Sequence, residues 1–320
     1  MRSSRPVDVL VDLLERSRAR GAAFAFSAMT APWGLNFPAT YEMGIHAIVA
    51  GAVTLEPEHG EPLQLVAGDL ALVRGDVAHQ LAHAPGADCM SLPAFLETGA
   101  VPGSPRRYAN GDGAPDAEFF CGAYLFSGDL CASLLAELPP VAHVRPHAGG
   151  SLRLALDLLA REMARDAPGQ QTILDRLLDV VLVHALREIF ARDLGTAPAW
   201  FRALDDPEVG AALRAVHGDP AAGWTVGTLA AQVGLSRAAF ARRFAQLVGE
   251  PPLEYVTSWR MALARERLRD TDDGLAAIAH DVGYASEFAF AAAFKRRHGV
   301  APGRWRTQSR EARDRQAVPA

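Results

Sequence analysis

The sequence predicts an α+β chain of two domains: a β-barrel-like unit completed by a helical hairpin, followed by an all-α domain. Three observations predict it. The chain has 320 residues, 49% hydrophobic and 22% charged, a composition typical of folded domains with their own cores. Short apolar runs separated by turn residues fill its first part, and a helical pattern occurs twice in its last part.

The β-unit is predicted between Ala22 and Cys131. Runs such as AAFAFSAM, IHAIVAGAVTLEP and LQLVAGDLALV are interrupted by Gly, Pro and Asp, a pattern typical of an antiparallel barrel or sandwich. Val7–Arg20 precedes these runs and has the apolar spacing of a short amphipathic helix. Val101–Pro115 is rich in Gly, Pro, Asn and Asp, and predicts a long mobile loop.

Two amphipathic helices, Ser151–Arg165 and Thr172–Arg192, are separated by an Ala-Pro-Gly turn and predict an antiparallel hairpin. The second helix has an apolar stripe that needs cover: Ile173, Leu177, Val180, Val181, His184 and Ile189. Either the β-unit or a second copy of the chain covers it, and the second alternative predicts a homodimer. We place the first domain at 1–195, with the hairpin at 151–192, and a linker at 196–207.

The same helical pattern occurs in Thr225–Pro252 and in Gly274–Pro302. Eight residue types of the first copy recur in the second. Three recur 49 positions later, namely Ala230, Val233 and Gly234, and five recur 50 positions later, namely Ser236, Phe240, Phe244, Gly249 and Pro252. The offset changes because Ala285 is inserted in the second copy. In each copy a helix ends at a Gly, and a Ser soon afterwards is placed to cap a second helix. This order predicts a helix-turn-helix motif, whose second helix enters the major groove of DNA.

Between the copies, Leu253–Arg269 predicts one long arginine-rich helix. The stretches LAAQVGLSRAAFARRF, VGEPPLEYVTSWRMALARERL and IAHDVGYASEFAFAAAFKRRHGVAPGRWR resemble the DNA-binding domain of the AraC/XylS family. The resemblance implies a transcription regulator that binds double-stranded promoter DNA through successive major grooves and, as an activator, contacts RNA polymerase. We place this domain at 208–310 and a disordered tail at 311–320.

Outward positions on the second helix of each motif are the predicted DNA contacts. They are Arg237, Ala238, Ala241, Arg242 and Arg243 in the first motif, and Glu287, Phe288, Ala291, Ala292, Lys295 and Arg296 in the second. Arg242 is the predicted reader of guanine, because a guanidinium bonds O6 and N7 together. Phe288 or Ala291 is predicted to touch a thymine methyl, and Glu287 to accept a hydrogen bond from a cytosine amine.

The other arginines of this region are predicted to meet phosphates: Arg243, Arg296, Arg297 and Arg304. The alternative is that they only solvate a helix face. Ala292 stands where many family members have a basic residue, which predicts weaker base reading by the second motif.

Charge is unevenly spread along the chain. Trp224–Arg310 carries 13 Lys and Arg against 8 Asp and Glu, a net charge of +5, whereas the rest of the chain carries −10. A basic part beside an acidic one fits a protein of which one part meets phosphates. Apolar stretches fall well short of the ~18–20 residues of a membrane helix, and the N-terminus lacks a signal-peptide core, so we expect a cytoplasmic protein without membrane contact.

The segment Gly51–His83 resembles a cupin barrel, the sensor domain of a subset of AraC-like regulators. GDLALVRGDVAH has the spacing of the second cupin motif, with Arg74 and Asp76 where Pro and Gly are usual, and the His-x-His of the first motif is missing. The resemblance implies that residues 1–195 are a cupin-like domain that senses a small-molecule effector.

Three histidines and a cysteine in this domain are candidate metal ligands. His79 and His83 are four residues apart, so both would point to one face of a strand. Together with His46 and the Cys121 thiol they would suit a divalent metal such as zinc. A low-pKa Cys121 or Cys89 would instead sense an oxidant. The alternative is that all of these are ordinary interior or surface residues.

We predict no enzyme active site, since the sequence lacks GxSxG, a P-loop and a GxGxxG followed by a helix. The leading hypothesis is a transcription regulator controlled by a small-molecule, metal or redox signal. The alternative is a cupin metalloenzyme, resembling a dioxygenase or isomerase, with an attached DNA-binding module. A non-specific DNA binder fits less well, because such binding depends almost wholly on phosphate contacts and the basic excess is modest.

Overall fold

The chain folds as two units in a computed structural model that describes residues 9–10, 20–39, 42–104, 106–125, 138–163, 165, 167–192 and 197–316. The unit that we call the β-unit consists of Ala19–Phe126 and Leu134–Ala197. The unit that we call the helical unit consists of Met1–Arg18, Ser127–Ser133 and Pro198–Ala320.

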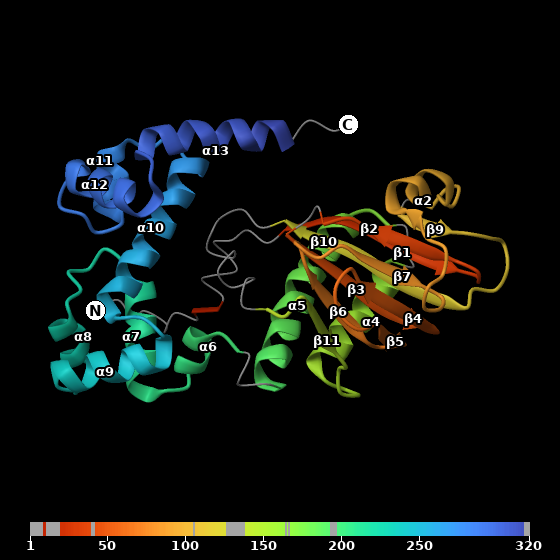
Figure 1. Cartoon of the computed structure of the whole chain (residues 1–320), viewed down its shortest axis with the longest axis horizontal. Coiled ribbons are helices and arrows are strands. Elements are labelled where there is room, and N and C mark those ends of the chain that lie inside the picture. The colour runs from red at the N-terminus through yellow and green to blue at the C-terminus, as the bar shows by residue number, and fades with distance from the viewer. Residues whose placement is uncertain are drawn as a thin grey trace. The chain divides into compact units, whose positions relative to one another are not determined.

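Two sheets form the framework of the β-unit (Figure 1). The larger has the strand order β11-β6-β3-β10-β1-β9, and the smaller has the order β5-β4-β7-β2-β8. Most neighbours are antiparallel, as predicted, but β9 runs parallel to β1 and β8 parallel to β2. The strands are β1 (Arg20–Met29), β2 (Gly34–Phe37), β3 (Met43–Ala50), β4 (Ala52–Pro57), β5 (Leu63–Val66), β6 (Leu70–Arg74), β7 (His79–Ala82), β8 (Met90–Ser91), β9 (Arg107–Ala109), β10 (Ala117–Leu125) and β11 (Val141–Val144).

The two sheets share one apolar core. Ile48 of β3 and Phe119 of β10 come from the larger sheet, and Leu35 of β2 and Leu55 of β4 come from the smaller one. Trp33 stacks on Phe119 with 5.3 Å between ring centroids. Burial of these large side chains holds the sheets together, so that inward residues of β3, β7 and β10 approach one another.

A short helix and strand β9 form one side of the β-unit. Helix α2 (Leu92–Thr98) begins after Ser91, whose hydroxyl accepts the backbone N–H three residues later. Strand β9 follows and pairs with β1, and Tyr108 of β9 packs on Phe95 of α2 with 5.8 Å between ring centroids. The prediction of a mobile loop over 101–115 is therefore wrong at β9, because pairing with a distant strand outweighs a composition rich in turn residues.

The predicted helical hairpin is confirmed as α4 (Ser151–Met163) and α5 (Gln170–Arg192). The buried face of α5 includes Leu174, Leu178 and Val181, and α5 contacts β1 and β11. The hydroxyl of Tyr124 on β10 donates a hydrogen bond to the carbonyl oxygen of Leu178 at 2.9 Å. One face of the hairpin is thus fixed to the larger sheet.

The helical unit contains the predicted tandem motif (Figure 1). Helices α8 and α9 form the first helix-turn-helix, α11 and α12 form the second, and α10 connects them. None of the described helices combines the length and apolar character that a bilayer crossing requires. The helices are α6 (Ala199–Ala203), α7 (Pro207–Gly218), α8 (Val226–Gln232), α9 (Arg237–Val248), α10 (Pro252–Asp270), α11 (Leu275–Asp281), α12 (Glu287–His298) and α13 (Pro302–Gln316).

Two predicted boundaries of this unit need correction. Helix α6 lies within the predicted linker 196–207, since Ala203 is buried in the core of the helical unit. Helix α13 continues to Gln316, so the tail predicted to be disordered from 311 is helical over 311–316. Arg310 holds this helix to the loop between α10 and α11 through a 2.8 Å ion pair with Asp272.

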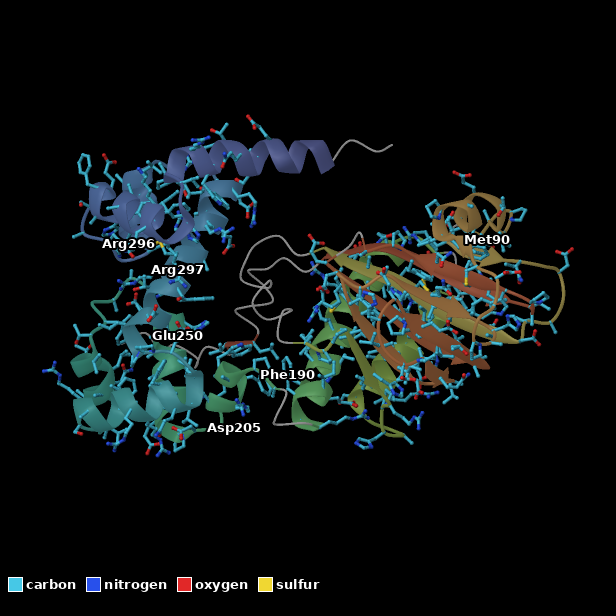
Figure 2. The ribbon with its side chains drawn as sticks, viewed as in Figure 1. Met90, Phe190, Asp205, Glu250, Arg296 and Arg297 are labelled. Carbon is cyan, nitrogen blue, oxygen red and sulfur yellow. The ribbon has the colours of Figure 1, made fainter. Side chains whose placement is uncertain are left out.

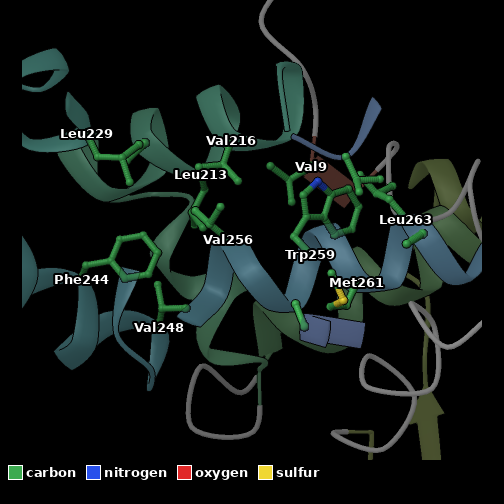
Figure 3. Close-up of a cluster of buried hydrophobic side chains, with 14 of the residues drawn as sticks. Val9, Leu213, Val216, Leu229, Phe244, Val248, Val256, Trp259, Met261 and Leu263 are labelled. Carbon is green, nitrogen blue, oxygen red and sulfur yellow. The ribbon is translucent and has the colours of Figure 1, made fainter. Parts of the chain in front are cut away.

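Val9 belongs to the helical unit, although 1–195 was predicted to be one domain. Val9 and Leu10 are helical and 1% and 3% exposed. Val9 joins the buried cluster that contains Trp259 and Val216 (Figure 3). The remainder of the predicted helix Val7–Arg20 lies outside the described residues.

Candidate nucleic-acid interface and buried histidine cluster

The same turn precedes α9 and α12, which we call the reading helices. Gly234 and Gly283 in these turns have φ angles of 72° and 81°. A left-handed backbone is strained for other residues, which accounts for the glycine in both copies. The hydroxyls of Ser236 and Ser286 then accept the backbone N–H three residues later at 3.3 and 3.2 Å, and so cap the helices.

A pair of phenylalanines anchors each reading helix. The ring centroids of Phe240 and Phe244 lie 5.6 Å apart, and those of Phe290 and Phe294 lie 5.7 Å apart. All four rings are at most 1% exposed. Because these residues recur every four positions on one side, the opposite side of each reading helix faces outward. The two motifs are therefore equivalent three-dimensional units, as predicted.

Most predicted DNA contacts lie on these outward sides. Two small residues, Ala241 and Ala291, are half-buried. The others are exposed: Arg237, Ala238, Arg242, Arg243, Glu287, Phe288, Ala292, Lys295 and Arg296. The predicted residues thus lie on two surfaces, one on α9 and one on α12, which are the corresponding helices of the two motifs.

The two surfaces differ in chemistry. On α9 the exposed side carries the guanidinium groups of Arg237 and Arg242. The first turns of α12 instead present Glu287, Ala292 and Phe288, whose side chain is 79% exposed. The Phe288 ring therefore takes no part in the core, and its contact with DNA stays a prediction.

Arg243 has a structural partner. Its guanidinium donates to Asp206 at 2.6 and 3.0 Å and lies 3.3 Å from Glu208. Asp206 caps α7 by accepting the backbone N–H of Val209 at 2.8 Å, and its contact with Arg243 lowers the pKa of the carboxyl against the opposing effect of burial. The predicted phosphate contact of Arg243 therefore competes with a role in holding α9 to α7.

Arg297 of α12 also has a structural partner (Figure 2). It donates to the Ser258 hydroxyl of α10 at 2.8 Å and attracts Glu250, which follows α9. Its neighbour Arg296 is exposed at the end of the same helix. The phosphate contact of Arg296 stays a prediction, whereas Arg297 joins the two motifs.

In the β-unit, strand pairing brings three of the predicted ligand residues together. His46 of β3 lies beside Cys121 of β10 in the larger sheet, and Phe37 of β2 lies beside His79 of β7 in the smaller one. His46 Nδ1 is 3.0 Å from Cys121 Sγ, and His46 Nε2 is 2.8 Å from His79 Nε2. Phe37 stacks on the His79 ring with 5.0 Å between centroids. All three polar side chains are buried.

The backbone carbonyl of Val77 fixes the direction of these hydrogen bonds. His79 Nδ1 lies 3.1 Å from this oxygen, which only accepts, so Nδ1 carries the proton and Nε2 is the acceptor. His46 Nε2–H then donates to His79, and the Cys121 thiol donates to His46 Nδ1. This directed chain satisfies each group in its neutral form. Burial lowers the pKa of His79 to about 4 and holds the pKa of His46 well below its usual value.

Two family models cover most of the chain. One, described as a cupin, matches residues 8–191, and the other, a helix-turn-helix domain, matches residues 229–308. An AraC-like transcription regulator of Streptomyces antibioticus is 34% identical over 307 residues, which are 94% of this chain and 98% of that protein. The chain belongs to the AraC family of transcription regulators.

Further relatives of this AraC-type regulator also span its length. The HTH-type transcriptional regulator AlkR of Acinetobacter baylyi is 28% identical over 95% of this chain and 100% of its own. The RCS-specific HTH-type transcriptional activator RclR of Escherichia coli is 28% identical over 95% of this chain and 99% of its own. The DNA-binding domain of AdpA, solved with a target DNA, is 30% identical and covers 34% of this chain and 98% of that domain, with a TM-score of 0.33.

The metal site predicted for this AraC-type regulator does not assemble. His83 lies beyond the end of β7, and its Nδ1 bonds the Trp33 carbonyl at 2.8 Å. His46 directs one ring nitrogen at Cys121 and the other at His79, so a single ion cannot reach all three at the ~2.0–2.3 Å of zinc ligands. Across the described residues, no three His, Cys, Asp or Glu side chains are arranged to hold a metal ion.

The prediction of a low-pKa cysteine is also wrong. Burial raises the pKa of Cys121 well above its usual value, and burial together with Glu56 and Asp88 raises that of Cys89. The Cys89 thiol donates to Gln80 Oε1 at 3.4 Å. Because the thiolate is the reactive form, the surroundings of both cysteines favour the unreactive thiol.

Sequence reasoning missed a cavity of about 150 Å³ beside the histidine cluster. Besides the cluster, its wall includes Phe37 of β2, Leu92 and Leu96 of α2, and Tyr108 of β9. The four-residue spacing of the two leucines was a signal of one helix face.

Proposed function

We propose that this AraC-type regulator binds a bipartite operator whose two halves are read by different chemistry. The observation that carries the proposal is the equivalence of α9 and α12, which expose matched positions with unlike side chains. Arg242 on α9 fits guanine, which offers O6 and N7 to a guanidinium. On α12, Phe288 and Ala291 fit thymine methyl groups, and Glu287 fits a cytosine amine.

The test uses a DNA duplex that the full chain selects from a pool of random-sequence duplexes. Arg242→Ala should weaken specific binding by about 1–3 kcal/mol and relax the preference at one base position. Arg296→Ala is the matched control: it should weaken binding to all sequences alike and reduce the salt dependence by about one phosphate contact. Equal affinity of wild type and Arg242→Ala in fluorescence anisotropy would contradict this reading of α9.

We also propose that the β-unit senses a chemical signal and changes how the helical unit engages DNA. The cavity beside the histidine cluster supports this role, since small-molecule sites are concave, mostly apolar and equipped with a few placed polar groups. The alternative of a cupin metalloenzyme has no support in the described residues, because its metal ligands do not converge. Operator titrations with and without candidate effectors test the signal response.

The proposed assembly is a homodimer through the hairpin. Four large apolar side chains of α4 and α5 are exposed, by 56% for Leu154, 52% for Leu158, 46% for Ile173 and 43% for Val180. Their spacing of four on α4 and seven on α5 places each pair along one side of its helix. The larger sheet covers another side of α5, so a second copy of the hairpin is the proposed cover for this one. Activation through RNA polymerase is proposed as well, and the Escherichia coli relative is named an activator.

A further inference from the structure

The cavity of the β-unit has a wall of mainly apolar side chains. Phe37 and Val77 line it from one side, Leu92 and Leu96 of α2 from another, and Tyr108 from β9. Its volume is about 150 Å³. An engineered apolar cavity of roughly this size in another protein admits benzene. The volume therefore suits a molecule built on one six-membered ring.

The charged and titratable groups of the wall are already satisfied. Cys121, His46 and His79 form the directed chain that ends on the Val77 carbonyl, so each is neutral, both ring nitrogens of the two histidines are bonded, and the Cys121 thiol donates its proton. Arg74 also lines the cavity, but its guanidinium donates to Asp76 at 2.6 and 3.0 Å and to the Leu138 carbonyl. An anion in this cavity would lose water without gaining an unpaired cation, which is costly.

Among the lining residues, Tyr108 supplies the remaining hydrogen-bonding side chain. Its ring is half-buried against Phe95, and its hydroxyl has no hydrogen-bond partner among the described residues. A phenolic hydroxyl both donates and accepts, so it can bind one polar atom of a ligand whose remaining surface is apolar.

We propose that this cavity binds an uncharged, mainly apolar molecule with a single six-membered ring, oriented by one hydrogen bond to the Tyr108 hydroxyl. The proposal deepens the proposed signal response by naming the chemical class of the effector. Four observations support it: the volume of the cavity, its mainly apolar wall, the existing hydrogen bonds of the histidine cluster and Arg74, and the Tyr108 hydroxyl, which has no partner among the described residues.

The experiment is isothermal titration calorimetry of the full chain with phenol, toluene, benzoate and glucose. Phenol and toluene should bind, and benzoate, which has the same ring with a negative charge, should bind at least about tenfold more weakly. Tyr108→Phe should weaken phenol binding by roughly threefold to tenfold and leave toluene binding unchanged. Tighter binding of benzoate or glucose than of phenol, or no binding of either ring compound, would overturn the proposal.

A cavity-filling variant locates the site. Leu96→Trp should abolish binding of both ring compounds, whereas Leu63→Trp, which alters a residue packed on the same core but outside the cavity wall, should not. Unchanged binding by Leu96→Trp would overturn the proposal, and Tyr108→Phe decides the matter if Leu96→Trp fails to fold. Operator affinity in the same samples separates the two proposals. Ring binding without an effect on operator affinity contradicts the signal response alone, and a response to another compound class contradicts the ligand class alone.

Discussion

At the scale of single residues, hydrogen-bond direction decides what the buried cluster is. The Val77 carbonyl oxygen can only accept a hydrogen bond, and it therefore sets the tautomer of His79. His79 in turn sets the tautomer of His46, and His46 sets the direction in which the Cys121 thiol donates. The same three residue types in another orientation would make a metal site or a reactive thiolate. Here they form a neutral, closed chain beside the cavity.

The buried histidines make the stability of the chain depend on pH. In the unfolded chain both titrate near 6.5, whereas in the folded chain the pKa of His79 is about 4 and that of His46 is well below its usual value. A lowered folded-state pKa means that the stabilisation is present above pH 6.5 and is lost as the pH falls toward 4. The free energy of unfolding should fall by at most about 1.4 kcal/mol per pH unit for each histidine.

Urea unfolding of the full chain at several pH values between about 7 and about 5 measures this slope. His79→Gln should reduce the slope, and His59→Gln, which alters an exposed histidine, should keep the wild-type slope. Identical slopes for wild type and His79→Gln would show that the cluster is not neutral in the folded chain.

How far the sequence predicts the site differs between the two units. The helix-turn-helix motif is local, since Gly234, Ser236 and Phe240 set the turn, the cap and the buried side within a few residues, and these three features are confirmed. The ion pair of Arg243 could not be predicted, because its partner Asp206 lies 37 residues away in a segment interpreted as a linker. His83 was misjudged because β7 ends at Ala82, which no local pattern indicates.

At the scale of elements, the two turn glycines are alike in backbone and unlike in surroundings. A Cβ added at Gly234 meets nothing within 4 Å, whereas one added at Gly283 would lie 2.7 Å from Arg260 and 2.8 Å from the Ala221 carbonyl oxygen. Arg260 of α10 is itself fixed by donating to the carbonyls of Pro220 and Ala222. The second turn is therefore packed against the connecting helix and the loop that precedes the first motif.

This difference predicts unequal costs for the same substitution. Gly234→Ala should lower the free energy of unfolding by about 1–2 kcal/mol, the cost of a left-handed backbone for alanine. Gly283→Ala should cost more, because the backbone of Ala221 must move as well. Thermal unfolding followed by circular dichroism compares the two variants, and equal losses would contradict the close packing of the second turn.

The exposed side of the hairpin predicts an association that charge would break. Leu154→Glu combined with Leu158→Glu should convert a dimer into a monomer in sedimentation velocity, because two carboxylates would have to be buried without partners. The matched control, Leu154→Met with Leu158→Met, keeps an apolar surface and should remain dimeric. A wild-type chain that sediments as a monomer would reject the proposed dimer outright.

At the scale of the whole molecule, the two units are not two consecutive stretches of sequence. Val9 precedes the β-unit but is buried in the core of the helical unit, with Trp259 and Val216 in the same cluster (Figure 3). Residues 198–320 alone therefore lack part of their own core. This arrangement could not be predicted, because an amphipathic helix before a β-unit indicates that it packs somewhere but not on which unit.

Val9→Ala should therefore destabilise the helical unit. Loss of two buried methyl groups should cost about 2 kcal/mol and weaken operator binding at elevated temperature. Hydrogen exchange read separately in the two units measures the effect: protection should fall in α7 and α10 and stay unchanged in the β-unit strands. A loss confined to the β-unit would contradict the placement of Val9.

The burial of Val9 has a consequence for how such regulators are recombined. A chimaera that joins residues 198–320 to a foreign sensor domain would keep both reading helices. It would have a cavity in the core of the helical unit where the Val9 side chain is missing. An exchange of sensor domains at this junction must therefore keep two separate coding segments, the one for the N-terminal residues around Val9 and the one for residues 198–320. Otherwise the foreign sensor must supply an apolar side chain that fills the same cavity.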